Sequence, residues 1–358
     1  MASITASAED LKTARKEKII SAINKSSGWF CALGFSWLVP LMKMAAGEDH
    51  REQLTELRST LFIPLLGIGL FLFAWGGLAP KVETSLGTIP GPVQVWEQSV
   101  NLWADHVRTR EKATAFYQRQ DVRNAKLIAA GKEDKVKHRV YTGKPSYIDQ
   151  IFTSLGTVGL GFVFATAIAV PLGIASGLSK GVNGAITPLI QIFKPVSPLA
   201  WLPIVTMIVS ALYVDVHDWL PKSMVVSAVT VTLCSLWPTL INTALGVASI
   251  DEDLMNVAKV LRLPTRQTIT KLVLPSSLPL IFTGLRLSLG VGWMVLIAAE
   301  MLAQNPGLGK FVWDEFQNGS SQSLAKIMVA VLTIGLIGFM LDRLMHALQQ
   351  AFTFTSNR

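Results

Sequence analysis

Long uncharged runs of apolar residues alternate with short polar segments over most of the chain. A helix needs about 20 mostly apolar residues to cross the hydrocarbon core of a bilayer. Six runs approach or exceed that length: Ser59 to Ala79, Ile151 to Leu178, Ile186 to Val214, Ser223 to Val247, Leu278 to Leu302, and Ile327 to about Ala351. The pattern predicts an all-α, polytopic membrane protein with about six transmembrane helices.

The polar segments divide the chain into four parts. Residues 1–58 are expected to be a cytoplasmic N-terminal segment, whose short apolar run Trp29 to Met42 fits an interfacial or elbow helix. Residues 59–80 hold the first span, and residues 81–147 a helical extracytoplasmic insertion. Residues 148–352 form a transmembrane core with a long cytoplasmic loop at 249–279.

Composition supports the membrane assignment. Only 16% of the residues are charged, against about 25% in soluble proteins, and 50% are hydrophobic, which excludes a disordered chain. The net charge of +8 favours orientation of helices in a membrane, so no nucleic-acid partner is expected. Cys31 and Cys234 lie in apolar stretches, so a disulfide framework or a cysteine metal site is not expected.

Basic residues in short loops predict the orientation of the spans. With the N-terminus inside, the short outer connections hold Lys222, Lys310 and Lys326. The inner connections hold Lys180, Lys194, Lys259, Arg262, Arg266 and Lys271. Both termini are therefore expected in the cytoplasm.

The segment from Lys81 to Pro145 would then lie outside, although it is rich in lysine and arginine. Loops of this length translocate largely regardless of charge. Trp103 to Ala130 is expected to form a basic helix that can pair with a second one. The segment is either a solvated helical hairpin or a docking face for an extracytoplasmic partner.

Motifs for catalysis are not evident. The sequence has no G-x-x-x-x-G-K-[ST] phosphate loop; in the nearest match, Gly307 to Lys310, Phe311 stands where the magnesium-binding hydroxyl belongs. The histidines have no metal-binding spacing. These observations favour a conduit over a membrane enzyme, with no cofactor held by the chain itself.

The inner loop between the fourth and fifth spans predicts two short amphipathic helices. Ser249 to Glu252 has the pattern of a capping box. An apolar stripe follows, at Leu254, Val257, Ala258 and Leu261. Pro264 ends the first helix, and Thr265 can cap a second that ends before Pro275. The stripe either packs under the chain's own spans or lies in the groove of a partner.

This loop resembles the "EAA" loop of ABC importer permeases. The residues Asn256-Val257-Ala258, then Arg262 four positions after Ala258, and later Leu274-Pro275, have the spacing of that motif. Asn256 stands for its glutamate, Val257 for its first alanine and Arg262 for its glycine. The resemblance implies a coupling helix that docks on an ATPase subunit through Leu254, Val257, Ala258, Leu261 and Arg262.

The resemblance extends over Ser154 to Arg343. Segments similar to the nitrate/sulfonate/taurine branch are Ser197 to Pro203, Leu236 to Pro238, Thr283 to Arg286 and Ala299 to Leu302, and Gly307 to Asp314 looks most like the nitrate and bicarbonate permeases. It implies the type I ABC importer permease fold. It also implies partners: two ATPase subunits that bind ATP and Mg, a second permease copy, and an extracytoplasmic substrate-binding protein.

Two charged residues lie inside the fifth span. An intramembrane cation such as Arg286 either attracts an anionic substrate or snorkels to the inner headgroups. Glu300 lies roughly 20 Å away along the helix and cannot pair with Arg286. We expect Glu300 to accept hydrogen bonds that hold the outer turn.

Polar residues near proline breaks are the other pathway candidates. Pro195, Pro198 and Pro203 interrupt the third span, and irregular backbone in a membrane is tolerated where it lines a cavity or is buried in protein. Ser197, Thr206, Thr239 and Asn242 can add a polar lining, or can join helices to each other. Gly284, Gly290 and Gly292 are expected to permit close helix packing.

The sequence therefore predicts the permease subunit of an ATP-driven importer of a small anion, with nitrate (or nitrite) first and bicarbonate, sulfonate or taurine as alternatives. The expected location is the bacterial inner membrane. An ATP-independent secondary transporter is the alternative class, but the inverted repeats of broken helices that it would show are not evident.

Overall fold

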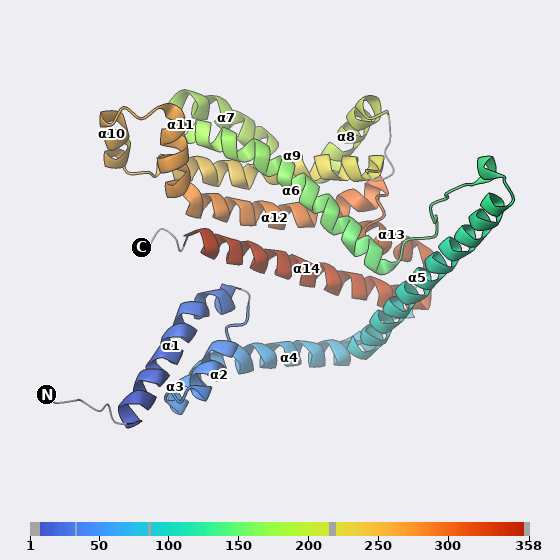
Figure 1. Cartoon of the computed structure of the whole chain (residues 1–358), viewed down its shortest axis with the longest axis horizontal. Coiled ribbons are helices and arrows are strands. Elements are labelled where there is room, and N and C mark those ends of the chain that lie inside the picture. Colours follow the sequence, from blue (N-terminus) through green and yellow to red (C-terminus); the bar gives the residue numbers. More distant parts are fainter. Residues whose placement is uncertain (1–7, 33, 85–86, 215–219, 354–358) are drawn as a thin grey trace.

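The computed structural model describes residues 8–32, 34–84, 87–214 and 220–353, and this part is almost entirely helical (Figure 1). The N-terminal part comprises α1 (Ala8–Ala32), α2 (Leu38–Ala45), α3 (His50–Leu57), the π-helical turn η1 (Arg58–Phe62), α4 (Ile63–Leu78) and the 3-10 turn η2 (Ala79–Lys81). The insertion comprises β1 (Glu83–Thr84), β2 (Gly87–Thr88), α5 (Pro92–Ala129) and the 3-10 turn η3 (Glu133–Lys135); the two strands pair antiparallel.

The core begins at α6 (Tyr147–Leu178). It continues through α7 (Lys180–Phe193), α8 (Pro198–Leu212), α9 (Lys222–Ala248), α10 (Glu252–Val260), α11 (Thr265–Thr268), the π-helical turn η4 (Ile269–Val273), α12 (Leu274–Ala303), α13 (Leu308–Asn318) and α14 (Ser321–Thr353). The loop helices α10 and α11 lie at one end of the molecule, and α13 with α5 at the other (Figure 1).

Five helical stretches are long and apolar enough to cross a membrane, and they correspond to five of the predicted spans. The sixth, Ile186 to Val214, is divided between α7 and α8, which are bent by 104°. Ser197 at the break has ψ 140°, the extended conformation that Pro198 imposes on the residue before it. The all-α fold with about six spans is confirmed.

Helix α9 lies at the centre of the core, where it packs on α6 and α12. Gly173 of α6 allows a close approach to α9, because a Cβ there would lie 2.6 Å from the Cβ of Thr243. Gly284 of α12 does the same against the backbone of Thr239, at 2.9 Å. The expected packing role holds for Gly284 and Gly292, whereas a Cβ at Gly290 would meet nothing within 4 Å.

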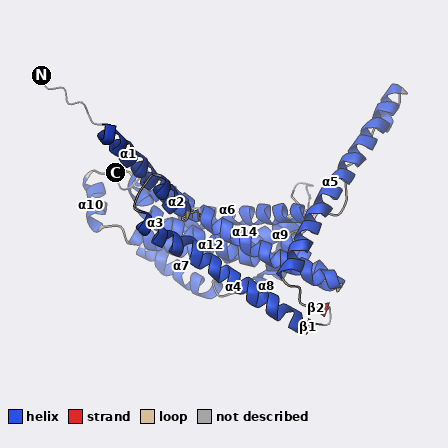
Figure 2. Ribbon diagram, turned by 90° about the horizontal axis from the view of Figure 1, so that it is seen from below, coloured by secondary structure: helices blue, strands red, loops and turns tan. Residues whose placement is uncertain are grey.

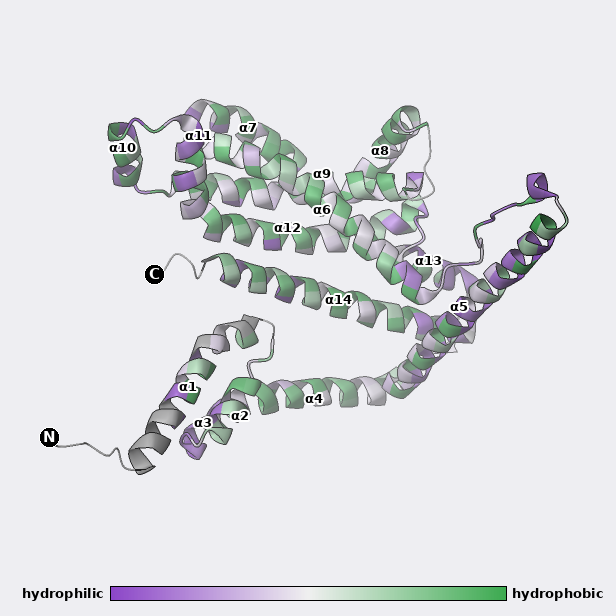
Figure 3. Cartoon of the chain, viewed as in Figure 1, coloured by the Kyte–Doolittle hydropathy of each residue, from purple (hydrophilic) through white to green (hydrophobic). Residues whose placement is uncertain are grey.

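The N-terminal part lies beside this core, and α1 contacts α14. The single elbow helix expected over Trp29 to Met42 is divided: α1 ends at Ala32 and α2 begins at Leu38. Gly34 between them has φ +86°, which only glycine adopts readily, so the helix stops there. Helix α4 is hydrophobic along its length and none of its most apolar part is buried within the chain (Figure 3).

The insertion contains one long helix rather than a helical hairpin. Helix α5 leads away from the bundle (Figure 2), and residues 136–146 return without forming a second helix. Side chains of α5 hold this return segment: Gln120 accepts a hydrogen bond from the backbone N of Arg139 at 2.7 Å, and Asn124 donates to the carbonyl of Lys137 at 3.1 Å.

Candidate functional site

The loop between α9 and α12 begins with a helix cap that differs from the predicted one. Asp251, not Ser249, caps α10, and its carboxylate accepts from the backbone N of Asp253 at 2.9 Å. The Ser249 hydroxyl instead donates to the carbonyl of Gly246 in α9, at 3.0 Å. The capping-box prediction at Ser249 is therefore wrong by two residues, because that serine completes the preceding helix.

The backbone conformation at the end of α10 explains why the EAA motif, which this loop resembles, carries glycine at the position of Arg262. Arg262 has φ +49°, a left-handed conformation that L side chains adopt at a cost. Its backbone N donates to the carbonyl of Lys259, and the N of Leu263 donates to that of Ala258, both at 3.0 Å. These two bonds form a Schellman motif, which normally places glycine at the position of Arg262.

The apolar face of α10 is largely uncovered within this chain. Helix α10 stands apart from the membrane core (Figure 1), and Leu254, Val257 and Leu261 are 46%, 54% and 64% exposed. Ala258 was predicted to belong to the same docking stripe, but its side chain is buried within the chain. Val260 was not part of the predicted stripe, but it is 81% exposed. The exposed face of α10 is therefore rotated toward Val260 relative to the predicted stripe.

The second loop helix does not end before Pro275, as the sequence predicted. Residues Thr265–Ala303 form one continuous helical stretch that runs from α11 into the membrane. The π-helical turn η4 immediately precedes Pro275; such turns widen the helix and change its hydrogen-bond ladder, so the missing N–H of proline is accommodated. Pro264 is the cap residue of α11, where Thr265 was expected.

Two of the pathway candidates lie on α8 and are exposed. Ser197 caps α8 at the break and accepts from the backbone N of Leu199 at 3.3 Å. Thr206 lies on an exposed side of α8 and donates to the carbonyl of Leu202 at 2.8 Å. Both residues are therefore exposed within this chain, while their hydroxyls bond to the backbone of α8.

Two further candidates lie in the core and serve helix contacts. The hydroxyl of Thr239 is buried and lies 2.7 Å from that of Ser288, which joins α9 to α12. Asn242 is half-buried and donates to the carbonyl of Pro238 at 2.8 Å. The helix-joining interpretation fits Thr239, whereas Asn242 keeps part of its side chain accessible.

Arg286 is paired within the chain, which the sequence analysis did not anticipate. Its Nη2 lies 2.8 Å from Oδ2 of Asp342 in α14, and Nε contacts Oδ1. Each side chain is 37% exposed, and small cavities that include Gly290 lie beside the pair. A paired arginine attracts an anion less strongly than a free one, because the carboxylate cancels much of its field.

A cavity that the sequence analysis missed lies between α6, α7 and α9. Its volume is about 590 Å³, and its polar lining includes Ser176, Lys180, Asn183, Thr187 and Gln191. The last three follow one another at four-residue spacing on one face of α7, and this pattern was the signal available in the sequence. Helix α7, which contributes most of this polar lining, lies next to α11 at one end of the bundle (Figure 1).

The expected role of Glu300 is confirmed at the opposite end. Its carboxylate is fully buried and accepts from the hydroxyl of Ser154 and from the backbone N of Gly309, at 2.8 and 3.1 Å. A Cβ at Gly307 would lie 2.1 Å from Oε1 of Glu300. The glycines that resembled a phosphate loop thus bring the start of α13 against an internal carboxylate.

Comparison with known families places the core in a transport group. The family described as "Binding-protein-dependent transport system inner membrane component" matches residues 169–354, which include the whole loop from α9 to α12 and all five pathway candidates. The matched segment comprises more than half of the chain.

Individual relatives carry two substrate names. A nitrate import permease protein of Synechococcus elongatus is 37% identical over 196 residues, which are 54% of this chain and 66% of the relative. A bicarbonate transport system permease protein of the same species is 33% identical over 291 residues, 81% of this chain and 88% of the relative. A putative ABC transporter permease protein of Methanocaldococcus jannaschii is 34% identical over 202 residues, 56% of this chain and 70% of the relative.

Proposed function

The chain belongs to the binding-protein-dependent transport permeases of the inner membrane, and on that premise we propose that it is the membrane subunit of an ATP-driven oxyanion importer. Nitrate and bicarbonate are the two candidate substrates, since relatives of both names match at similar identity. Nitrate is placed first because, of the two relatives from Synechococcus elongatus, the one of that name has the higher identity, 37% against 33%. The chain itself is proposed to be non-catalytic, with both termini in the cytoplasm.

The observation that carries this proposal is the free apolar face of α10. Leu254, Val257 and Leu261 project from a short, capped helix that stands off the core, and exposed apolar faces of this kind mark contacts with other proteins. The proposed partner at this face is an ATPase subunit, which would bind ATP and Mg. Arg262 shapes the end of the helix, and Ala258 supports it from the buried side.

The proposed complex has further members. A second copy of the chain would complete the pathway, two ATPase subunits would bind the two α10 helices, and an extracytoplasmic binding protein would deliver the substrate. Ser197, Thr206 and Asn242 are the proposed neutral lining, while Thr239 and Arg286 hold the helices that carry it. The cavity near Lys180 is proposed as the inner part of the pathway.

Uptake of labelled nitrate tests the proposal. Cells that express the permease, its ATPase and its binding protein should take up nitrate, and cells with an ATPase that cannot hydrolyse ATP should not. Labelled bicarbonate in the same cells separates the two substrates. Equal uptake with and without hydrolysis would favour a secondary transporter instead.

A further inference from the structure

A second polar cavity lies where the insertion meets the outer end of the core. It is enclosed by the first half of α5, the start of α6, α13 and the start of α14, and its volume is about 290 Å³. We call it the outer basic cavity. Helices α5 and α13, which line it, lie at the end of the bundle away from α10 (Figure 1), and this end is extracytoplasmic in the membrane orientation proposed above.

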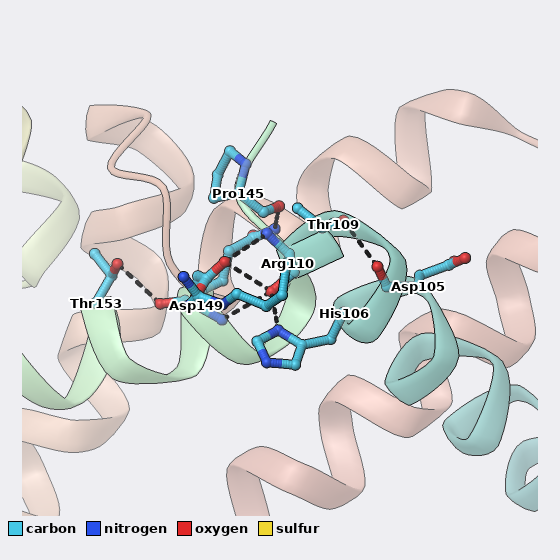
Figure 4. A network of polar contacts seen from close by, with 9 residues as sticks. Asp105, His106, Thr109, Arg110, Pro145, Asp149 and Thr153 are labelled. Carbon is cyan, nitrogen blue, oxygen red and sulfur yellow. Dashed lines mark hydrogen bonds and ion pairs between the residues drawn. The ribbon is translucent and has the colours of Figure 1, made fainter. Parts of the chain in front are cut away.

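A hydrogen-bond network fixes α5 against α6 beside this cavity (Figure 4). Arg110 pairs with Asp149, and Nδ1 of His106 lies 2.7 Å from the hydroxyl of Ser146. Ser146 in turn donates to Asp149 at 2.8 Å and caps α6. The side of the cavity that α5 forms is therefore fixed to the start of α6 by these contacts.

The charges around the outer basic cavity do not balance. Four cations line it, Arg108, Lys112, Lys144 and Lys326, against two carboxylates. Lys326 pairs with the buried Glu315 at 3.2 Å, and Arg108 contacts Asp105 at 3.4 Å on the exposed side of α5. Lys112 and Lys144 have no carboxylate partner within the described part of the chain. Lys112 lies on α5, and Lys144 lies in the return segment just before α6.

The cavity has a closed floor on the membrane side. The rings of Tyr147 and Phe311 pack with centroids 4.8 Å apart, and both residues line it. About two helical turns further along α6, Ser154 and Glu300 close the contact between α6 and α12. A ligand in the cavity would thus contact water on one side and cations on the other, above a packed core.

We propose that the outer basic cavity binds a small oxyanion from solution, with Lys112 and Lys144 as its charged ligands. The proposal rests on the function proposed above, because that function supplies an oxyanion on this side of the membrane. The volume suits the size of the ligand: a water molecule occupies about 30 Å³ of liquid, so the cavity holds nitrate together with several waters. Cations around a partly enclosed site raise the local anion concentration by 10-fold or more at low salt, on the order of what steering achieves elsewhere.

Direct binding tests this assignment without transport. The permease with its ATPase, but without the binding protein, would be placed in nanodiscs of phosphatidylcholine, and broadening of the nitrogen NMR line of sodium nitrate would be measured. The test variant carries Lys112→Gln and Lys144→Gln. The control carries Lys132→Gln and Lys135→Gln, which removes two exposed lysines of the same insertion that do not line the cavity.

We expect the test variant to lose most of the line broadening, on the order of tenfold, and the control to keep it. Raising the salt concentration to about 0.5 M should weaken the difference, because the Debye length then falls well below 10 Å. Equal broadening in both variants would overturn the proposal. Loss of broadening in the unmodified protein when phosphatidylglycerol is added, through the same two lysines, would assign the site to a lipid phosphate and also overturn it.

Failure of the proposed function has a different signature. An unmodified complex that binds nitrate through Lys112 and Lys144 but shows no ATP-dependent uptake would contradict the importer and leave the site. An importer with normal uptake whose lysine variant binds nitrate as the control does would contradict only the site.

Discussion

The hydroxyl of Ser154 lies 2.8 Å from a carboxylate oxygen of Glu300, a residue 146 positions further along the chain, and neither side chain is exposed. Ser154 also accepts from the backbone N of Leu308 at 2.9 Å. One serine thus joins α6, α12 and α13 at one end of the bundle. Because a buried carboxylate without hydrogen bonds is strongly unfavourable, the three helices are fixed together at this point.

Removal of this hydroxyl should destabilise the protein. Ser154→Ala removes one hydrogen-bond donor from the buried Glu300 and leaves the N–H of Leu308 without its acceptor, and it should lower the free energy of unfolding by about 1–3 kcal/mol. Ser99→Ala is the control, since Ser99 is only half-buried and its hydroxyl bonds to a carbonyl of its own helix. Thermal unfolding followed by tryptophan fluorescence should show a lower midpoint for Ser154→Ala alone, and equal midpoints would contradict this interpretation.

The pair of Arg286 and Asp342 should behave as a structural unit. Arg286→Gln leaves an unpaired carboxylate inside the membrane, so the yield of folded permease should fall. The double variant Arg286→Gln with Asp342→Asn removes both charges and should restore folding and nitrate uptake. A double variant that folds normally but no longer transports nitrate would instead assign Arg286 a direct role in attracting the substrate.

The left-handed residue at the end of α10 predicts an unusual order of substitutions. Arg262→Gly should keep or raise stability by about 1 kcal/mol, because glycine removes the steric cost of a positive φ. Arg262→Val should disrupt the loop and reduce the amount of ATPase that co-purifies. At Arg266, inside a helix, glycine should be the worse of the two substitutions. The same order at both positions would argue against the left-handed turn.

Reporter fusions test the orientation. A periplasmic reporter should be active at Lys132 in the insertion and at Gly319 after α13, and inactive at Ser179 and Thr265. This pattern follows from the excess of lysine and arginine in the proposed inner loops. An inactive fusion at Lys132 would reverse the orientation of the first two spans.

The sequence predicted the features that depend on local composition. Runs without charge identified the spans, and the prolines near Ser197 identified the break between α7 and α8, because both effects act within a few residues. The buried acceptor role of Glu300 also followed from its position in an apolar helix.

Features that depend on distant partners were not predictable. Asp342 lies 56 residues from Arg286, so nothing in the local pattern indicated their pair. Ala258 was placed on the exposed face because periodicity gives the spacing of a stripe but not the direction in which it is turned. The cavity near Lys180 required three helices to be placed relative to one another.

The exposed face of α10 provides the central test. Val257→Asp places a carboxylate in the proposed ATPase contact, and burial of an unpaired charge there should prevent docking. Asn256→Asp adds the same charge on a neighbouring, solvated part of the helix and is the control. Val257 is preferred to Ala258 because a charge at the buried Ala258 would also disturb the loop itself.

The most direct measurement is nitrate-stimulated ATP hydrolysis by the complete complex, reconstituted in proteoliposomes with its binding protein. The unmodified complex and Asn256→Asp should show stimulated hydrolysis. In Val257→Asp the stimulated rate should fall at least about tenfold, which corresponds to about 1.4 kcal/mol if weaker docking of the ATPase limits the rate. Stimulated hydrolysis at the unmodified rate in Val257→Asp, with the ATPase still bound, would contradict the account.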